Sequence, residues 1–475
     1  MNFKLNLPMP KFLQTLQSWW FSSQAKFFQL ISPLQAWREG SRLLSAKFLG
    51  GLLVVMLATL PFLENAQTGI ISAAVAIAWL MLWLSDRRDA EDQTAPIWTA
   101  IHTPLISYWA IALVATLISP VRVAAADGMV KLTLYMLAFV SMSRLMRLGW
   151  RSIFIAAYLG SALIASAYGI QQWYLGAPEL ATWTDPTSET AGITRVYSFL
   201  GNPNLFAGYL MPALPMGAIA AIHWRGWGMK ALGIITAIFG AFCLTQTQSR
   251  GGLMGIAAES FTLVLLLVYW WGKRLPKWTF PAVFGGTAGA IALGTVLVPT
   301  LRKRVFSIFG TDDSSNAFRV NVWKSVIKMI EDRPVFGIGP GNKAFNIVYP
   351  FYQRSGYSAL GTYSVPLEIT VETGIVGVIC YGWLVFTVFR QGWLGLNRLR
   401  SDRDSSGLWI IAAIATLMGM LVHSLVDTVW YRPQVQLLWW LAIAIISSFY
   451  SAPIAILNDL WKNREEEIKA KTWKN

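Results

Sequence analysis

Apolar runs of about 20 residues recur along the chain and are separated by shorter polar stretches. A run of this length spans the hydrocarbon core of a bilayer as a helix, because a helix satisfies its own backbone hydrogen bonds. The pattern therefore predicts an all-α polytopic membrane protein with about 12 transmembrane helices. The predicted spans are residues 44–63, 67–85, 98–118, 127–146, 152–173, 203–222, 229–247, 251–271, 278–300, 365–389, 407–428 and 434–452.

One polar stretch, residues 301–364, interrupts this pattern between the ninth and tenth predicted spans. A loop of such length is usually either functional or disordered. Within it, Phe318–Arg333 has the apolar spacing of an amphipathic helix, and Pro334 ends the pattern. We therefore expect an ordered loop that carries function. The predicted apolar face consists of Val322, Trp323, Val326, Ile327 and Ile330, with Ser315 or Asn316 as the cap.

The basic residues orient the predicted spans, because they are concentrated in one set of connections. By the positive-inside rule, that side of the membrane is cytoplasmic. Both termini then lie in the cytoplasm, and residues 301–364 lie outside as a large loop between helices 9 and 10. The cytoplasmic connections carry Arg87, Arg88, Arg144, Arg147, Arg151, Arg225, Lys230, Lys273, Arg274, Lys277, Arg390, Arg398, Arg400 and Arg403.

This topology divides the chain into five segments. Residues 1–43 form a cytoplasmic, interfacial amphipathic segment, and residues 44–300 form a membrane domain of helices 1–9. Residues 301–364 are the external loop, residues 365–452 supply helices 10–12, and residues 453–475 are a cytoplasmic tail. The pattern predicts a multi-pass protein of the plasma (inner) membrane.

Composition narrows the range of partners. The chain has 475 residues, of which 55% are hydrophobic and 13% charged, and its net charge is +15. The positive-inside bias explains much of that charge, so we expect a lipid bilayer and no nucleic acid as partner. Cys243 and Cys380 both lie in apolar runs, and the three histidines lack metal-binding spacing. We expect no metal site and no cofactor, apart from coupling to Na⁺.

Four arginines lie on the predicted external side, where the positive-inside rule does not favour them: Arg195, Arg250, Arg319 and Arg432. Arginine presents a fixed fork of donors that suits carboxylate, bicarbonate or phosphate oxygens. Arg250 is also predicted near a helix N-terminus, which favours an anion. Together they predict an external anion site. The alternative is that they reach lipid headgroups or pair with acidic side chains.

Three acidic residues lie in or beside the last predicted spans. Glu368 and Glu372 are four residues apart and share one face of a helix, and Asp427 follows His423 at the same spacing. Carboxylates inside a membrane span usually face a cavity or a partner. They are candidates for pairing with the external arginines, for binding a cation or for relaying a proton, or they are caps and structural ion pairs. No catalytic residue is assigned from the residues alone.

Several motifs between residues 190 and 430 resemble the O-antigen ligase and polymerase superfamily. They are TRVYSFLGNPN, SRGGLMG, the run from Arg319 to the predicted tight turn GIGPG, PLEITVETGIVG and HSLVD. Within that superfamily the chain is most similar to cyanobacterial IctB-type proteins, which are described as bicarbonate transporters or inorganic-carbon accumulation proteins. The resemblance implies a twelve-helix fold with a large external loop between spans nine and ten.

The resemblance also implies site roles. Ligases of this superfamily hold a polyprenyl-diphosphate-linked glycan donor with external arginines, and these roles would fall on Arg195, Arg250 and Arg319. The ligases place a catalytic histidine and an asparagine where this chain has Tyr363 and Ser364. A phenol, with a reference pKa of about 10, is not a ready base near pH 7.

Three functions from different classes follow. The first, and the leading hypothesis, is bicarbonate accumulation by transport, with the arginines as the anion site and Glu368 or Glu372 coupling a cation. The second is a glycosyltransferase of the ligase type that uses a lipid-linked glycan. The third is a membrane scaffold that assists another uptake complex. A lateral groove beside Arg250 and Arg319, wide enough for a lipid, would favour the transferase, and a closed central path would favour transport.

Overall fold

The computed structural model describes residues 35–85, 98–178, 195–272, 314–429 and 432–450, with a few residues between 275 and 293. These ranges contain helices and no strand. The apolar helices are α2 (Gln35–Thr59), α3 (Asn65–Leu84), α4 (His102–Leu117), α5 (Arg122–Leu145), α6 (Arg151–Leu175), α7 (Pro203–Leu210), α8 (Ala213–His223), α9 (Trp227–Gln246), α10 (Arg250–Trp271), α15 (Val365–Ser401), α16 (Leu408–Ser424) and α17 (Pro433–Ser448).

Each of these helices overlaps a predicted span, although several boundaries differ. The one predicted at 203–222 consists of two helices, α7 and α8, and the one predicted at 278–300 lies largely outside the described residues. Seven described helices are long and apolar enough to cross a membrane, and shorter apolar helices accompany them. The chain is therefore a multi-pass membrane protein. The number of spans and their orientation remain predictions.

Two segment boundaries can be compared with the structure. The predicted start of the membrane domain at residue 44 falls inside α2, which already begins at Gln35. The predicted end of the external loop at residue 364 agrees with the start of α15 at Val365. Residues 1–34 and 451–475, which include most of the interfacial segment and the tail, lie outside the described residues.

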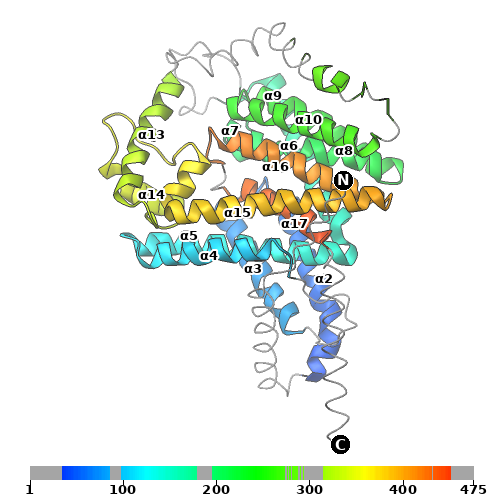
Figure 1. Ribbon diagram of the computed structural model, residues 1–475, viewed down its shortest axis with the longest axis horizontal. Coiled ribbons are helices and arrows are strands. Elements are labelled where there is room, and N and C mark those ends of the chain that lie inside the picture. Colours follow the sequence, from blue (N-terminus) through cyan, green and yellow to red (C-terminus); the bar gives the residue numbers. More distant parts are fainter. Residues whose placement is uncertain are drawn as a thin grey trace, which may run out of the picture.

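Helices α16 and α17 lie at the centre of the bundle, and nearly all of their residues are buried. Helix α10 packs along α16, α17 along α5, and α15 along α4 (Figure 1). The closest approaches use small residues, as is common between membrane helices. A Cβ atom on Gly255 of α10 would come within 2.9 Å of the Gly419 carbonyl oxygen of α16.

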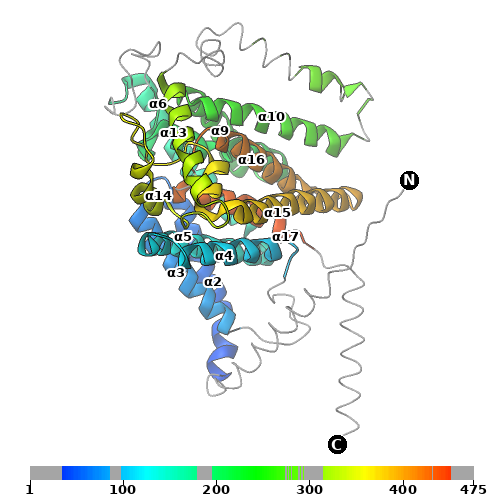
Figure 2. The same ribbon diagram turned by 60° about the vertical axis from the view of Figure 1, so that its left-hand side comes forward.

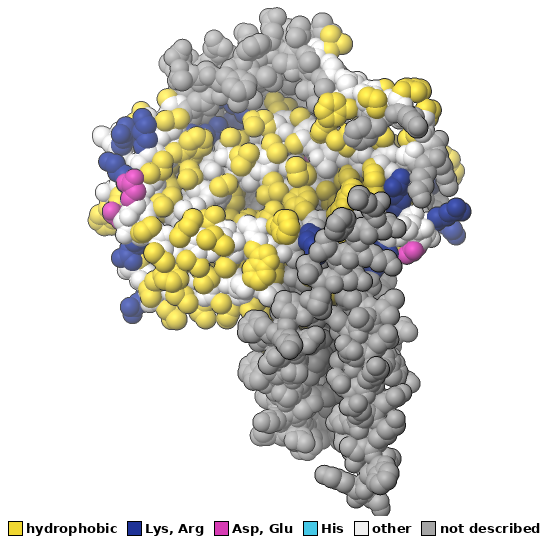
Figure 3. All heavy atoms as spheres, in the orientation of Figure 1, with side chains coloured by type: hydrophobic (Ala, Val, Ile, Leu, Met, Phe, Trp, Pro, Cys, Tyr) yellow, Lys and Arg dark blue, Asp and Glu magenta, His cyan; other side chains and the backbone are white. Residues whose placement is uncertain are grey.

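The surface separates apolar from charged side chains. In Figure 3, hydrophobic side chains cover the middle of the visible face, and charged side chains gather at its two opposite ends. This is the distribution expected of a protein whose middle faces lipid and whose ends face water.

The predicted external loop forms a small helical subdomain on the end of α15, named the external subdomain after its predicted side of the membrane (Figure 2). Its helices are α13 (Ser314–Asp332) and α14 (Asn342–Val348). This confirms the predicted amphipathic helix, although α13 begins before both predicted caps. The buried face is also rotated from the predicted one, because α13 packs through Val322, Val326 and Met329, and Ile327 is 46% exposed.

Helix α15 is broken at Gly374, whose φ of 67° and ψ of −171° are not helical. The freed carbonyl groups accept hydrogen bonds from the loop: Ile338 N–H donates to Val371 O and Gly339 N–H to Glu372 O, each at 2.9 Å. Non-helical backbone at this depth requires such protein partners. The predicted tight turn at Gly337–Gly341 is confirmed, and its residues fill the break.

Candidate functional site

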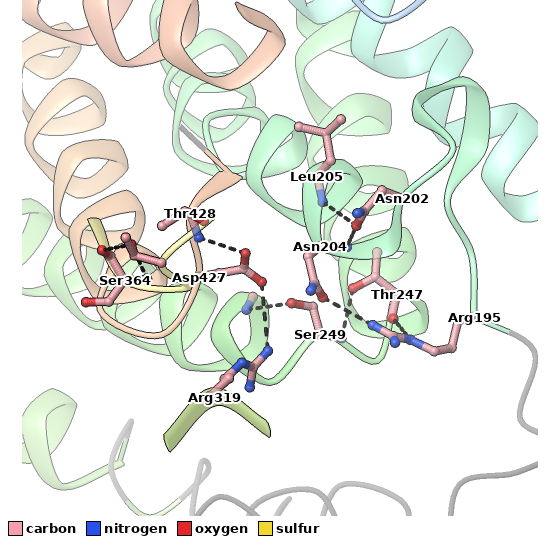
Figure 4. A network of polar contacts seen from close by, with 12 residues as sticks. Arg195, Asn202, Asn204, Leu205, Thr247, Ser249, Arg319, Ser364, Asp427 and Thr428 are labelled. Carbon is pink, nitrogen blue, oxygen red and sulfur yellow. Dashed lines mark hydrogen bonds and ion pairs between the residues drawn. The ribbon is translucent and has the colours of Figure 1, made fainter. Parts of the chain in front are cut away.

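An ion pair joins the external subdomain to the membrane helices. Nη2 of Arg319, on α13, lies 4.0 Å from Oδ2 of Asp427, and the two side chains are 16% and 10% exposed. Figure 4 shows both side chains pointing toward each other across the gap between α13 and the turn after α16. The structure therefore brings two of the predicted site residues together.

Asp427 lies in a turn and not on a helix. The predicted span 407–428 is too long at its end, because α16 stops at Ser424. Asp427 and His423 therefore do not share a helical face as predicted. The Asp427 Oδ1 atom accepts a 2.8 Å hydrogen bond from the Thr428 N–H, which fixes the carboxylate toward α13.

The end of the external loop packs against α13 and against the turn that carries Asp427. Gly361 lies against Thr428, and the Trp323 indole of α13 donates a 3.0 Å hydrogen bond to the Thr362 carbonyl. Tyr363 has a φ of 55°, which is uncommon for a residue with a side chain. Its ring contacts that of Phe318 edge-on, with centroids 5.8 Å apart. Tyr363 therefore packs against the residue that precedes Arg319, in a strained backbone conformation of the kind found at functional sites.

His423 lies beneath the ion pair and is only 1% exposed. Its ring rests on Gly251 of α10, where a Cβ atom would come within 2.6 Å of the His423 Cδ2. The charges of Asp427 and Arg319 both act on the ring, and its Nε2 has no hydrogen-bond partner among the described residues. This buried ring packs against α10 at Gly251 and against α7 at Gly208.

Arg250 is the first residue of α10, as predicted, and is buried. Ser249 caps this helix, since its Oγ accepts a 3.2 Å hydrogen bond from the Gly252 N–H. Because Gly251 lies against the His423 ring, the N-terminus of α10 is close to the end of α16, which leads into the turn with Asp427. Backbone N–H groups at such a terminus favour an anion.

Arg195 forms hydrogen bonds to two other segments of the chain. Its Nε donates to the Thr247 carbonyl at 3.0 Å, and an Nη atom donates to Asn204 Oδ1 at 3.2 Å. Asn202 caps α7 as predicted, because its Oδ1 accepts from the N–H groups of Asn204 and Leu205 (Figure 4). Arg195 thus joins the start of α7 to the segment that leads into α10.

The two carboxylates of α15 have different surroundings. Glu372 Oε1 accepts a 2.7 Å hydrogen bond from the Gly341 N–H, so this side chain holds the loop turn. Glu368 is buried, and its Oε2 has no hydrogen-bond partner within the described ranges. Glu372 and, more weakly, Asp427 act on Glu368 electrostatically. Its role in cation or proton coupling remains a prediction.

Arg432 is the N-cap residue of α17. It lines a cavity of 360 Å³ with Glu64 and Gln434, and neither Arg319 nor Asp427 lines that cavity. A second cavity of 710 Å³ lies at Ile118–Ala124 and Ile347. Neither of these cavities is lined by Arg250 or Arg319, so they do not distinguish a transferase from a transporter.

One buried acid was missed by the sequence reasoning. Glu259 of α10 is fully buried, and neither of its carboxyl oxygens has a hydrogen-bond partner among the residues described. An acid within an apolar run is the signal that could have found it. The described residues contain no group of three or more His, Cys, Asp and Glu side chains that could hold a metal ion.

The comparisons with known proteins concern the same part of the chain. No curated protein matches it. Residues 235–382 match the family model of the O-antigen ligases, and this range contains Arg250, Arg319 and Tyr363. From α9 through the external subdomain into α15, where these site residues lie, the chain is similar to the O-antigen ligases.

Proposed function

We propose that this protein is a membrane glycosyltransferase of the O-antigen-ligase type. It would transfer a glycan from a polyprenyl diphosphate to a hydroxyl group of an acceptor on the external side. The observation that carries the proposal is the Arg319–Asp427 pair, which sets a phosphate-binding side chain opposite a carboxylate. The family match at residues 235–382 supports it.

The proposed reaction exchanges one bond at the anomeric carbon of the donor sugar. The acceptor hydroxyl oxygen attacks that carbon, and the bond from the carbon to the diphosphate oxygen breaks. The diphosphate leaves with added negative charge, which Arg319 would hold through its fork of donors. The α10 N-terminus, with Arg250 and the Ser249 cap, would hold a second phosphate oxygen.

The proton of the acceptor hydroxyl also needs an acceptor. Tyr363 occupies the position that is histidine in the ligases, and a phenol does not take up a proton near neutral pH. Asp427 is the carboxylate that faces Arg319, so we assign the proton to Asp427. While the site is empty, Arg319 and Asp427 neutralise each other. A donor diphosphate that binds Arg319 would release Asp427 for this role.

The test is transfer of a radiolabelled glycan from a polyprenyl diphosphate by the full-length protein in lipid vesicles. Arg319→Gln should lose transfer by at least about 100-fold, the scale at which a single transition-state donor contributes. Arg354→Gln is the matched control, because Arg354 lies in the same loop and bonds Asn321 on the exposed surface. Equal activity of Arg319→Gln and the wild-type protein would refute the proposal.

A second candidate function is the transport of bicarbonate with coupling to a cation. The break of α15 at Gly374 favours it, because interrupted membrane helices surround ion sites in many transporters. Glu368 lies on the external side of this break, and one of its carboxyl oxygens lacks a partner in the described structure. Labelled bicarbonate flux into vesicles that contain only this protein, with and without a Na⁺ gradient, tests it. Flux no greater than in empty vesicles would exclude transport.

A further inference from the structure

The cavity beside Arg432 lies where three segments distant in the sequence meet. They are the turn between α2 and α3, the start of α7 and the start of α17. Leu205, one of its lining residues, belongs to the same α7 turn whose Asn204 binds Arg195 (Figure 4). The cavity therefore shares the α7 turn with the candidate site, but neither Arg319 nor Asp427 lines it.

A buried amide forms one wall of this cavity. Gln434 is 4% exposed, and its Nε2 donates a 2.9 Å hydrogen bond to the Leu63 carbonyl. Its Oε1 is buried without a hydrogen-bond partner in the described parts of the chain. Buried polar atoms are nearly always paired, so this acceptor calls for a donor. A rotation of the Gln434 amide would turn this oxygen toward the cavity, where a hydroxyl group of a ligand supplies the donor.

The other polar lining favours a ligand with both hydroxyl groups and a negative charge. Arg432 is the N-cap residue of α17, so a positive helix end lies at the cavity, whereas the Glu64 carboxylate already caps the positive end of α3. The Arg432 fork suits a carboxylate. Glu64 and Asn65 add side-chain oxygens that accept hydrogen bonds from hydroxyl groups.

The rim of the cavity is aromatic. The rings of Phe62 and Phe199 lie 5.0 Å apart at 73°, and these residues are 39% and 46% exposed. An exposed aromatic face can cover the C–H face of a sugar ring. The cavity volume of 360 Å³ lies at the small end of small-molecule sites, which hold about 300–1,000 Å³.

We propose that the Arg432 cavity binds a sugar ring that carries a carboxylate, as a subsite for the glycan of the transfer reaction. The assignment rests on the proposed function for its role, but its binding chemistry is independent of Arg319. A bicarbonate ion is too small to contact the Gln434 amide, the Arg432 fork and the aromatic rim together.

Saturation-transfer NMR of glucuronate binding to the full-length protein in detergent tests the proposed subsite. The wild-type protein should bind glucuronate, and Arg432→Gln should bind it at least about tenfold more weakly, since a charge-assisted pair is lost. Gln434→Leu should also weaken binding. Gln436→Leu on the same helix and Arg319→Gln should bind as the wild type does, because neither side chain lines the cavity. Circular dichroism and gel filtration establish that each variant is folded.

The absence of glucuronate binding by the wild-type protein would overturn the assignment. So would unchanged binding by a folded Gln434→Leu variant, which serves if Arg432→Gln does not fold, or equal binding of uncharged glucose. Arg432-dependent glucuronate binding without any glycan transfer would refute the proposed function and leave the subsite standing. Glycan transfer without glucuronate binding would refute the subsite alone.

Discussion

The carboxylate of Glu372 accepts a 2.7 Å hydrogen bond from the backbone N–H of Gly341. This bond joins a membrane helix to the external loop, next to the break in α15. The α14 helix begins immediately after Gly341, so the carboxylate also fixes the position of α14. Glu372 therefore has a structural role that does not depend on any ligand of the neighbouring Glu368.

Removal of the Glu372 carboxylate should loosen the external subdomain. We expect Glu372→Ala to destabilise the docked loop by about 1–3 kcal/mol, because the Gly341 N–H loses a charged acceptor. Glu372→Gln keeps an acceptor oxygen without its charge and should have a smaller effect. Hydrogen exchange of the backbone amides in α13 and α14 measures the change. Unaltered exchange in Glu372→Ala would show that the bond contributes nothing.

The break in α15 depends on a glycine. At Gly374 the φ of 67° disfavours any side chain, and a Cβ atom there would overlap with the Val335 carbonyl. Gly374→Ala should therefore destabilise the protein by more than about 1 kcal/mol. Gly382→Ala is the matched control in the same helix, because a Cβ atom at Gly382 would have no neighbour within 4 Å.

Gly382→Ala should leave stability unchanged or raise it by up to about 1 kcal/mol, since alanine is the better helix former. Thermal unfolding of both variants in detergent compares them. If Gly374→Ala were as stable as Gly382→Ala, α15 could continue without the break, and the loop contacts to Val371 and Glu372 would not be needed.

The contact between His423 and Gly251 predicts a coupled pair of mutations. Gly251→Ala should push against the His423 ring, where a Cβ atom would come within 2.6 Å of Cδ2. His423→Ala in the same chain should relieve that clash. We expect a coupling energy of at least about 0.5 kcal/mol in a double-mutant cycle measured by unfolding. Strictly additive effects would mean that the ring moves aside freely.

The sequence predicted the helices well, because long apolar runs leave a membrane segment little alternative to a helix. It did not predict the break at Gly374, since that break depends on hydrogen bonds to loop residues distant in sequence. The end of α16 was placed too late because Leu425 and Val426 continue the apolar run beyond the last helical residue. Glu259 was missed for a similar reason, as one acid hardly changes the character of the run around it.

The external arginines show the same limit of sequence reasoning. Topology placed Arg319 and Arg432 on one side of the membrane, but only the fold decides which side chains meet. Arg319 reaches Asp427 because α13 folds back over the turn after α16. Arg432 instead lies at the start of α17, against the turn between α2 and α3. Arg432 thus lines a cavity that neither Arg319 nor Asp427 lines.

The Arg319–Asp427 pair allows structure and function to be separated by exchanging its charges. Arg319→Asp and Asp427→Arg alone each place two like charges together, so each should expose the amides of α13 to hydrogen exchange. The double variant restores an ion pair and should restore protection of α13. It should not restore glycan transfer, because the arginine then lies on the turn after α16 and the carboxylate on α13, which reverses the arrangement that the proposed reaction needs. Recovery of transfer in the double variant would show that the pair only stabilises the contact between α13 and the membrane helices.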